Sequence, residues 1–430
     1  MFDQNLGRLD RITRANAIRA KNKIYYQYLW KIYLFQNSIT TPQLESISAE
    51  QGEIYQQKQQ EEYIDYRDTD VVWLSEQNIR ENVFDKKTGY KPKERNACVL
   101  DECTFFGGLA IPYYNKEYVL EPFGGDISSF LEIKRITESK NYFDNNISLT
   151  KEFLTRYSKK NYEKNCERDQ ETKSHTIFPL VHWYQSYYHW VIDYLPKLRI
   201  LDIYEKETGN EPKILIREDA AGYRKESLEL LGYSEDRILE WKNNDCVKSR
   251  ALFTNHRKNP WEHSRQDYSW LRENILDKVI CGGEINNNSN KRIYISRQGE
   301  KDNKNIHNNE RSVTNFQSFR DLIKSHGFRV IRAENYTIAE QVKIFNSADV
   351  IMSPHGAGLT NMIFAKDPLV IELFPDSFVI PLYSYLCDTL KFEYLPIVVD
   401  SNDRNLVVDL ELFDNILSLI PEFDRSFFNQ

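Results

Sequence analysis

The amino-acid sequence predicts an α/β fold in two domains. A chain of 430 residues is too long for one hydrophobic core of ordinary size and long enough for two. Strand-like apolar runs alternate with helical runs, which is the order of an α/β protein. A Gly- and Asn-rich cluster at 281–291 has the composition of a connector. We therefore expect an N-terminal domain over 96–283 and a C-terminal domain over 284–405.

Composition and charge narrow the class of protein. A hydrophobic fraction of 40% and a net charge of -7 describe a globular chain with no general attraction for nucleic acid. The six cysteines are scattered and form no Cys-x-x-Cys pair, as expected of reduced thiols in a cytoplasm. No run reaches the roughly 18 apolar residues of a membrane span, and no signal peptide is evident. We expect a cytoplasmic protein, or one resting on the cytoplasmic face of a membrane.

Residues 1–95 are expected to form a helical extension. Residues 1–35 divide into a basic half and the aromatic half "IYYQYLWKIYLF". That order suits an amphipathic helix on a membrane surface, and it equally suits a helix packed on the first domain. The second arrangement is the commoner use of one apolar face, so peripheral membrane association is the alternative.

The N-terminal domain is expected to open with paired strands. Residues 97–123 combine β-branched and aromatic residues around Gly107 and Gly108, which predicts strands joined by a turn. The elements expected after them are a strand that opens the stretch 174–203, a helix over 187–201, a strand over 213–216, a helix over 223–232, and strands over 237–241 and 249–255.

The C-terminal domain has the clearest βα pattern, which predicts a parallel sheet. Gly327 stands where a helix ends in a left-handed residue, and Thr337 with Glu340 predicts a capping box. Strands are expected at 292–297, 328–331, 349–353, 369–373 and 394–399, and helices at 315–327, 339–348 and 379–390. The closing residues 406–430 carry an amphipathic segment that we expect to fold back over the domains.

The loop "PHGAGLTN", residues 354–361, lies between a predicted strand and a helix. Ligands of open parallel sheets bind at the carboxyl ends of strands. Gly356 and Gly358 could adopt backbone angles closed to other residues and admit a ligand, while N–H groups at the helix start favour phosphate. We predict a diphosphate site with His355 as a donor, and the residues predicted to bind the diphosphate are Gly356, Ala357, Gly358, Leu359 and Asn361. The alternative is a tight turn whose histidine caps the helix.

Two further strand ends carry groups suited to a nucleotide. Arg297 follows the strand at 292–297 and could bind phosphate, and Glu372 lies at the end of the strand at 369–373 and could accept hydrogen bonds from a ribose. Either residue could instead form an ordinary ion pair.

His189 and Asp193 lie four residues apart on a predicted helix and can touch. Either member could take a proton from an attacking hydroxyl, or the two could be an ordinary pair on a helix surface. The histidine spacing fits no three-ligand metal site, so we expect chemistry without a metal or other cofactor.

These segments, taken in order, resemble glycosyltransferase family 61. The resemblance covers roughly residues 175–378 and rests on the strings "HWVIDYLPKLRIL", "RIYISR", "NNERSV", "AEQVKIFNSADVIMSPHGAGLTNMIFA" and "LVIELFP". It implies a GT-B architecture of two Rossmann-like domains facing across a cleft. It also implies inverting, metal-independent transfer of a hexosyl or pentosyl group from a nucleotide sugar, commonly a UDP-sugar.

Carried over to this chain, the resemblance puts Arg297 and the His355 loop at the diphosphate, Glu372 at the ribose and the His189–Asp193 pair at the acceptor. Asp193, oriented near His189, is then the expected base. The acceptor would be a glycan or glycolipid hydroxyl in surface polysaccharide or capsule synthesis.

One departure from the family pattern opens alternatives. A second arginine often precedes Asn-Glu in the family, whereas this chain reads "KNIHNNERSV", with Lys304, Asn305 and His307 there instead. Lys304 could substitute as a point charge. The alternatives are a nucleotide-sugar epimerase of the same fold and a catalytically silent relative that binds a glycan.

Overall fold

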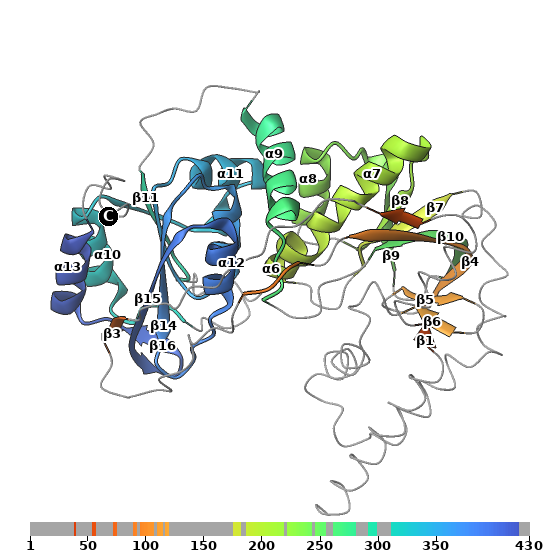
Figure 1. The fold of residues 1–430 in the computed structure, drawn as a ribbon. Coiled ribbons are helices and arrows are strands. Elements are labelled where there is room, and N and C mark those ends of the chain that lie inside the picture. The colour runs from red at the N-terminus through yellow and green to blue at the C-terminus, as the bar shows by residue number, and fades with distance from the viewer. Residues whose placement is uncertain are drawn as a thin grey trace, which may run out of the picture.

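The computed structural model describes a set of residues in two sheets with their covering helices. The described residues are 38–39, 54–56, 72–74, 89–92, 95–106, 110–114, 117–119, 175–181, 186–218, 222–242, 246–254, 261–280, 291–298 and 311–420. Figure 1 shows the two sheets side by side, with α8 and α9 between them. We call the first sheet with the helices of 186–280 the N-terminal lobe, and the second sheet with the helices of 311–420 the C-terminal lobe.

The sheet of the N-terminal lobe is mixed. Among the described residues its order is β1-β6-β5-β4-β10-β7-β8-β9, with β2 also on β4. The strands β10, β7, β8 and β9 run parallel, and the β4–β5–β6 meander joins β10 antiparallel. The strands are β1 (Ser38–Ile39), β2 (Ile54–Gln56), β4 (Asn96–Phe106), β5 (Ile111–Tyr114), β6 (Glu117–Val119), β7 (Thr176–Pro179), β8 (Lys213–Arg217), β9 (Ile238–Trp241) and β10 (Cys246–Thr254).

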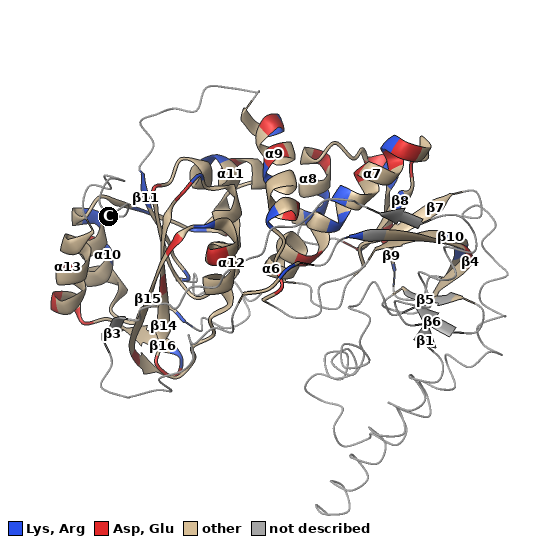
Figure 2. Ribbon diagram, in the orientation of Figure 1, with Lys and Arg blue, Asp and Glu red and all other residues tan. Residues whose placement is uncertain are grey.

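The helices of this lobe lie on the side of the other sheet. They are α6 (Tyr187–His189), a π-helical turn (Trp190–Tyr194), a 3-10 turn (Leu195–Lys197), α7 (Leu198–Thr208), α8 (Tyr223–Leu230), a 3-10 turn (Glu235–Arg237) and α9 (Arg265–Ile280). In the view of Figure 2, acidic and basic residues are mixed along α7 and α9. No helix in the described part of the chain is both apolar enough and long enough to cross a bilayer.

The C-terminal lobe is a doubly wound parallel sheet. Its described strands follow the order β12-β11-β13-β14-β15-β16, with β16 antiparallel. The elements are β11 (Arg292–Ile295), α10 (Phe316–Ser325), β12 (Phe328–Ile331), a 3-10 turn (Ala333–Asn335), α11 (Ile338–Asn346), β13 (Val350–Pro354), a 3-10 helix (Ala357–Phe364), β14 (Leu369–Pro375), α12 (Leu382–Leu390), β15 (Glu393–Asn402), β16 (Asn405–Val407) and α13 (Leu410–Leu419).

Local signals in this lobe act as the sequence predicts. The Thr337 hydroxyl accepts from the Glu340 N–H while the Glu340 side chain accepts from the Thr337 N–H, so the capping box opens α11. Gly327 follows α10 with a φ of +79°, the left-handed region that glycine favours. The amphipathic α13 packs on α10, with the rings of Phe319 and Phe413 5.3 Å apart.

The helical extension expected over residues 1–95 is not confirmed by the parts of this region that the structure describes. Its described pieces in regular structure are the short strands β1, β2 and β3 (Val72–Leu74). β3 runs parallel to Ile397–Val399 of β15 and so belongs to the sheet of the C-terminal lobe. Short runs of Val, Trp, Ile and Tyr gain little as isolated helices and are stabilised by pairing with an existing sheet edge. The predicted surface helix in 1–35 lies outside the described residues.

The two lobes share an apolar cluster and polar bonds. Trp190 and Leu271 of one lobe belong to the same buried cluster as Val342 and Phe364 of the other. A carboxylate oxygen of Glu226, on α8, accepts from the N–H of Ile338 at 2.6 Å, at the start of α11. A carboxylate at a helix N-terminus satisfies an otherwise unpaired donor and meets the positive end of the helix dipole. The lobes are therefore docked to each other along α8, α9 and α11.

Candidate functional site

The candidate site begins where the chain changes direction in the C-terminal sheet. After β11 the chain passes to β12 on one side, and it returns to β13 on the other side of β11. Such a switch point leaves a crevice outside the carboxyl ends of the two central strands. Arg297 lies two residues beyond β11, and His355 directly follows β13. The predicted diphosphate residues therefore meet at the switch point.

Arg297 lies directly against Gly356. A Cβ atom added to Gly356 would overlap Nη1 of Arg297 and lie 3.1 Å from Cζ. Gly356 has a φ of 174°, which is extended backbone open to any residue. The expectation of unusual backbone angles here is therefore wrong, because the glycine is required for close approach instead. The group that approaches is the guanidinium of Arg297, which is held beside the loop.

His355 and Glu372 form a buried pair. Nδ1 of His355 and Oε1 of Glu372 are 2.5 Å apart, and the histidine is 7% exposed while the glutamate is 0% exposed. The Tyr394 hydroxyl donates to the other carboxylate oxygen of Glu372. Burial first, and then the Glu372 charge, raise the pKa of Tyr394 well above its usual value, so the phenol stays a donor.

This pairing corrects the role expected for Glu372. A ribose contact needs a carboxylate at the surface of the site, but this one is enclosed and both oxygens are engaged by His355 and Tyr394. An ionised carboxylate can only accept, so the Nδ1 of His355 donates the proton to it. Glu372 therefore orients His355, and the second ring nitrogen, Nε2, is the one that can serve a ligand.

Tyr383, on α12, fixes the conformation of the loop 354–361. Its hydroxyl donates to the Gly356 carbonyl at 2.8 Å and lies 3.1 Å from the Thr360 hydroxyl. Burial raises the pKa of Tyr383 well above its usual value, so the hydroxyl keeps its proton. The Leu359 N–H also donates to the Gly356 carbonyl, at 3.1 Å. The loop is thus fixed at that carbonyl by one bond from α12 and one bond from within the loop.

Two residues predicted to bind the diphosphate, Leu359 and Asn361, instead use their hydrogen-bonding groups within the protein. The Leu359 side chain is fully buried and its N–H is used within the loop, while Ala357 and Gly358 are only half-buried. Asn361 is also fully buried, and its side chain donates to Oε1 of Gln341 at 2.6 Å. Its own Oδ1 accepts from the Tyr187 hydroxyl at 2.6 Å. Asn361 therefore joins the two lobes, in place of the diphosphate contact expected of it.

The predicted pair on the N-terminal lobe forms. Nδ1 of His189 and Oδ2 of Asp193 are 2.6 Å apart, with side chains 27% and 5% exposed. The helix expected over 187–201 is interrupted there, because α6 continues as a π-helical turn and then a 3-10 turn at Pro196. Proline has no N–H to donate, and single π-helical turns are frequent at functional sites.

Two tyrosines connect the histidines of the two lobes. The ring of Tyr188 lies edge-on to His189 at 5.1 Å and edge-on to Tyr383 at 5.6 Å. The ring of Tyr383 is 5.6 Å from that of His355. The acceptor-side pair and the diphosphate loop are therefore neighbours across the contact between the lobes.

Two arginines beside Phe378, whose ring neighbours that of His355, were not among the predicted site residues. The guanidinium groups of Arg311 and Arg404 lie 5.4 Å and 5.2 Å from the ring of Phe378, which is 5.9 Å from the His355 ring. Both arginines have positive φ, 69° and 74°. For Arg404 this belongs to the two-residue turn, with Asp403, that joins β15 to β16. For Arg311 it is a conformation that is costly outside glycine and is often found at functional sites. Arg311 stands in the string "NNERSV", which was the available signal for it.

Other predicted groups are not placed. Lys304 lies outside the described residues. Within the ranges that the structure describes, no three His, Cys, Asp or Glu side chains converge as metal ligands. Metal-free chemistry stays a prediction that requires an activity measurement.

The chain was compared with models of known protein families. Residues 187–371 match the family described as Glycosyltransferase 61, a span that begins at α6 and includes Asp193, Arg297 and His355. These residues form a glycosyltransferase family 61 domain. The resemblance expected from the motifs is thereby confirmed, and the activity class of the family 61 domain is glycosyl transfer. The search of curated proteins returns no match to this chain.

Proposed function

We propose that this family 61 protein is an inverting glycosyltransferase that moves a sugar from a UDP-sugar to a glycan or glycolipid hydroxyl without a metal ion. The observation that carries the proposal is the placement of two histidine–carboxylate pairs on the two sides of the Tyr188–Tyr383 contact between the lobes. His189–Asp193 comes from one lobe and His355–Glu372 from the other. Acid/base chemistry on both sides of a reacting bond requires such an arrangement.

On the acceptor side we assign His189 as the base. Asp193 is almost fully buried, whereas His189 is the more exposed member of the pair. An ionised carboxylate holding Nδ1–H fixes the tautomer in which Nε2 can accept a proton. This revises the expectation that Asp193 itself is the base, since Asp193 orients the imidazole and stabilises its charged form.

On the donor side the protein supplies positive charge for the departing diphosphate. Arg297 beside Gly356 offers a planar set of donors, and His355 offers Nε2 while Glu372 holds Nδ1. We assign Arg311, which lies over the Phe378 ring, as a second guanidinium for the diphosphate, in the role considered for Lys304. Fixed donors aimed at developing negative charge are among the largest contributions to catalysis.

The reaction is a single displacement. The acceptor oxygen forms a bond to the anomeric carbon from the face opposite the diphosphate, and its proton passes to Nε2 of His189. The bond from that carbon to the diphosphate oxygen breaks, and the electron pair leaves with UDP. Configuration at the anomeric carbon is inverted.

Transfer with purified protein in the presence of a chelator tests this proposal. A panel of UDP-, GDP- and CMP-hexoses and pentoses is screened first for protection against thermal unfolding, which reports the preferred donor. We expect a UDP-sugar to protect and transfer to persist in chelator. Activity that disappears and returns with manganese would reject the metal-free account, and a changed sugar without any acceptor would indicate an epimerase.

Asp193→Asn separates catalysis from binding. We expect transfer to fall by roughly 10²- to 10⁴-fold, because the amide no longer stabilises the charged imidazole. UDP affinity should be unchanged. Asp202→Asn is the matched control, since Asp202 is also part of an i,i+4 pair, with Lys206 at 2.7 Å, on α7. Its transfer rate should equal that of the wild type.

The acceptor and location are part of the same proposal. A glycan or lipid-linked glycan in surface polysaccharide synthesis would be reached at the cytoplasmic face of a membrane, where residues 1–35 could associate. Binding to lipid vesicles, measured for the full chain and for a variant lacking its first 35 residues, tests whether this segment associates with a membrane.

A further inference from the structure

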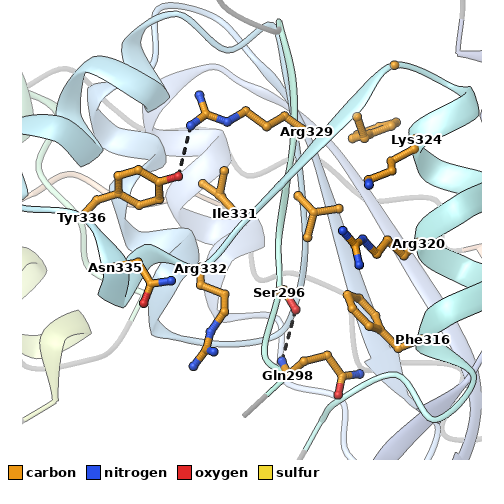
Figure 3. Close-up of a pocket in the computed structure, with 13 residues that line it drawn as sticks. Ser296, Gln298, Phe316, Arg320, Lys324, Arg329, Ile331, Arg332, Asn335 and Tyr336 are labelled. Atoms are coloured by element: carbon orange, nitrogen blue, oxygen red, sulfur yellow. Dashed lines mark hydrogen bonds between the residues drawn. The ribbon is translucent and has the colours of Figure 1, made fainter. Parts of the chain in front are cut away.

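A pocket of about 760 Å³ follows the free edge of β12 in the C-terminal lobe. β12 is the last strand of the described sheet on this side. α10 forms one wall, and the residues after β12 form the other (Figure 3). At the end nearest the candidate site it is lined by Ser296 and Gln298, which flank Arg297. The pocket therefore includes the two sequence neighbours of Arg297 and extends away from Arg297 along β12.

The pocket is strongly basic. Arg320 and Lys324 project from α10 on one side, and Arg329 and Arg332 come from β12 and its end (Figure 3). None of the described lining residues is acidic. This concentration of positive charge runs against a net charge of -7 for the chain. A local excess of one sign in a hollow attracts a ligand of the opposite sign.

Two of these four side chains form hydrogen bonds within the protein, and the other two do not. Arg329 donates to the Tyr336 hydroxyl at 3.1 Å, and Arg332 donates to Glu334 at 2.9 Å. The side chains of Arg320 and Lys324, four residues apart on the same face of α10, have no ion pair or hydrogen bond with any described residue. Their charges are available to an anion that lies along the strand edge.

The shape and the remaining groups indicate what kind of anion fits. The neutral polar side chains Ser296 and Gln298 flank Arg297 in the sequence, Asn335 lies beside Arg332, and the rings of Phe316 and Tyr336 stand on the two walls (Figure 3). Hydroxyl-rich ligands use such hydrogen-bonding side chains, while the separated cations require more than one negative charge. An extended saccharide with carboxylate or phosphate groups meets both requirements.

We propose that this pocket, defined by Arg320, Lys324, Arg329 and Arg332, binds an acidic saccharide as a second site beside the donor loop. The inference rests on the proposed function, because it identifies the acceptor glycan as one carrying carboxylate or phosphate groups. The negatively charged part of the acceptor lies along β12 while another of its hydroxyl groups reacts. A nucleic acid would use the same charges, but its binding requires a broader basic face than one strand edge.

Equilibrium binding to the full chain tests the site without requiring transfer. The protein is first saturated with UDP, so that the donor site is filled. The probes are an oligogalacturonate for carboxylates, inorganic diphosphate for phosphate, neutral maltohexaose, and a single-stranded oligonucleotide. We expect one or both anionic small probes to bind, maltohexaose not to bind, and affinity to fall as salt is raised. The stronger of oligogalacturonate and diphosphate identifies the acidic group.

The double variant Arg320→Gln with Lys324→Gln should weaken the anionic probe about tenfold or more, because two charge-assisted contacts are lost. The double variant Lys343→Gln with Lys366→Gln is the matched control, since both lysines are exposed and lie outside the pocket. These two substitutions remove the same charge as the pocket variant. The control should keep wild-type affinity. Thermal unfolding of both variants verifies that they fold.

Separate outcomes identify separate failures. Equal loss in both double variants, no binding of either anionic probe, or tighter binding of the oligonucleotide overturns the acidic-saccharide site. UDP affinity of the pocket variant, measured in the same samples, should be unchanged. If the wild type binds the anionic probe but neither binds UDP nor transfers a sugar, the proposed function fails while the second site stands.

Discussion

Nδ1 of His355 lies 2.5 Å from Oε1 of Glu372, and this contact joins the end of β13 to the middle of the neighbouring parallel strand β14. The pair is enclosed, with Tyr394 bonded to the second carboxylate oxygen. A histidine held in this way presents one defined nitrogen to a ligand. The geometry of the donor site therefore depends on a residue that need not touch the donor.

Glu372→Gln should lower kcat by roughly a hundredfold with little change in KM. The amide oxygen can still accept from Nδ1, but it no longer stabilises a positive charge on the His355 ring as the diphosphate leaves. The measurement is the pH profile of kcat for the variant and the wild type. Tyr394→Phe is the control because it keeps the carboxylate, and its profile should keep the wild-type shape. An unaltered profile for Glu372→Gln would mean that the pair is only structural.

Gly356→Ala should weaken UDP binding by about tenfold, since the new methyl group displaces Arg297 and its charged hydrogen bonds are lost. Calorimetric titration with UDP measures the effect. Gly209→Ala is the matched control, because nothing lies within 4 Å of the added Cβ and the site is elsewhere. It should lose stability, given its φ of +69°, but retain UDP affinity. Equal affinities for both variants would remove Arg297 from the donor site.

Tyr187→Phe should cost about 1–3 kcal/mol of unfolding free energy. The change leaves the fully buried Oδ1 of Asn361 without its 2.6 Å donor at the contact between the lobes. Urea unfolding at equilibrium gives the value. Tyr336→Phe, at a part-exposed hydroxyl bonded by Arg329, should change stability by about 0.5 kcal/mol or less. A neutral Tyr187→Phe would show that the bond does not hold the lobes together.

Stability should fall as pH rises above about 10, the usual pKa of tyrosine in an unfolded chain. Burial raises the pKa of Tyr294, Tyr383 and Tyr394 in the folded protein. Because the folded state keeps protons that the unfolded state loses, their contribution is complete below pH 10 and is lost as pH climbs toward the raised values. Tyr294→Phe should make this decline shallower by up to about 1.4 kcal/mol per pH unit. Urea unfolding between pH 9 and 11 checks both slopes, and parallel slopes would contradict the assignment.

The fold of the C-terminal lobe could be predicted because its signals are local. Thr337 with Glu340 and the glycine at 327 each determine a helix end within a few residues. The His189–Asp193 contact was equally accessible, since four residues along a helical segment bring side chains together.

The parts that could not be predicted depend on contacts between distant segments. Glu372 bonds to Tyr394, 22 residues away, and Asn361 bonds to Tyr187, 174 residues away, so neither partner is visible in a local pattern. A strand end identifies a residue near a site but does not distinguish one that binds a ligand from one that orients a neighbour. The strand β3 was missed for a related reason, because three residues adopt this conformation only beside β15.

The central claim is that the donor diphosphate lies against the bend between Pro354 and Gly358, and a crystal structure of the protein with UDP in the presence of chelator tests it most directly. We predict phosphate oxygens within hydrogen-bonding distance of Arg297 and of Nε2 of His355. UDP bound elsewhere in the molecule, with these two side chains unchanged and without contact to it, would contradict the account.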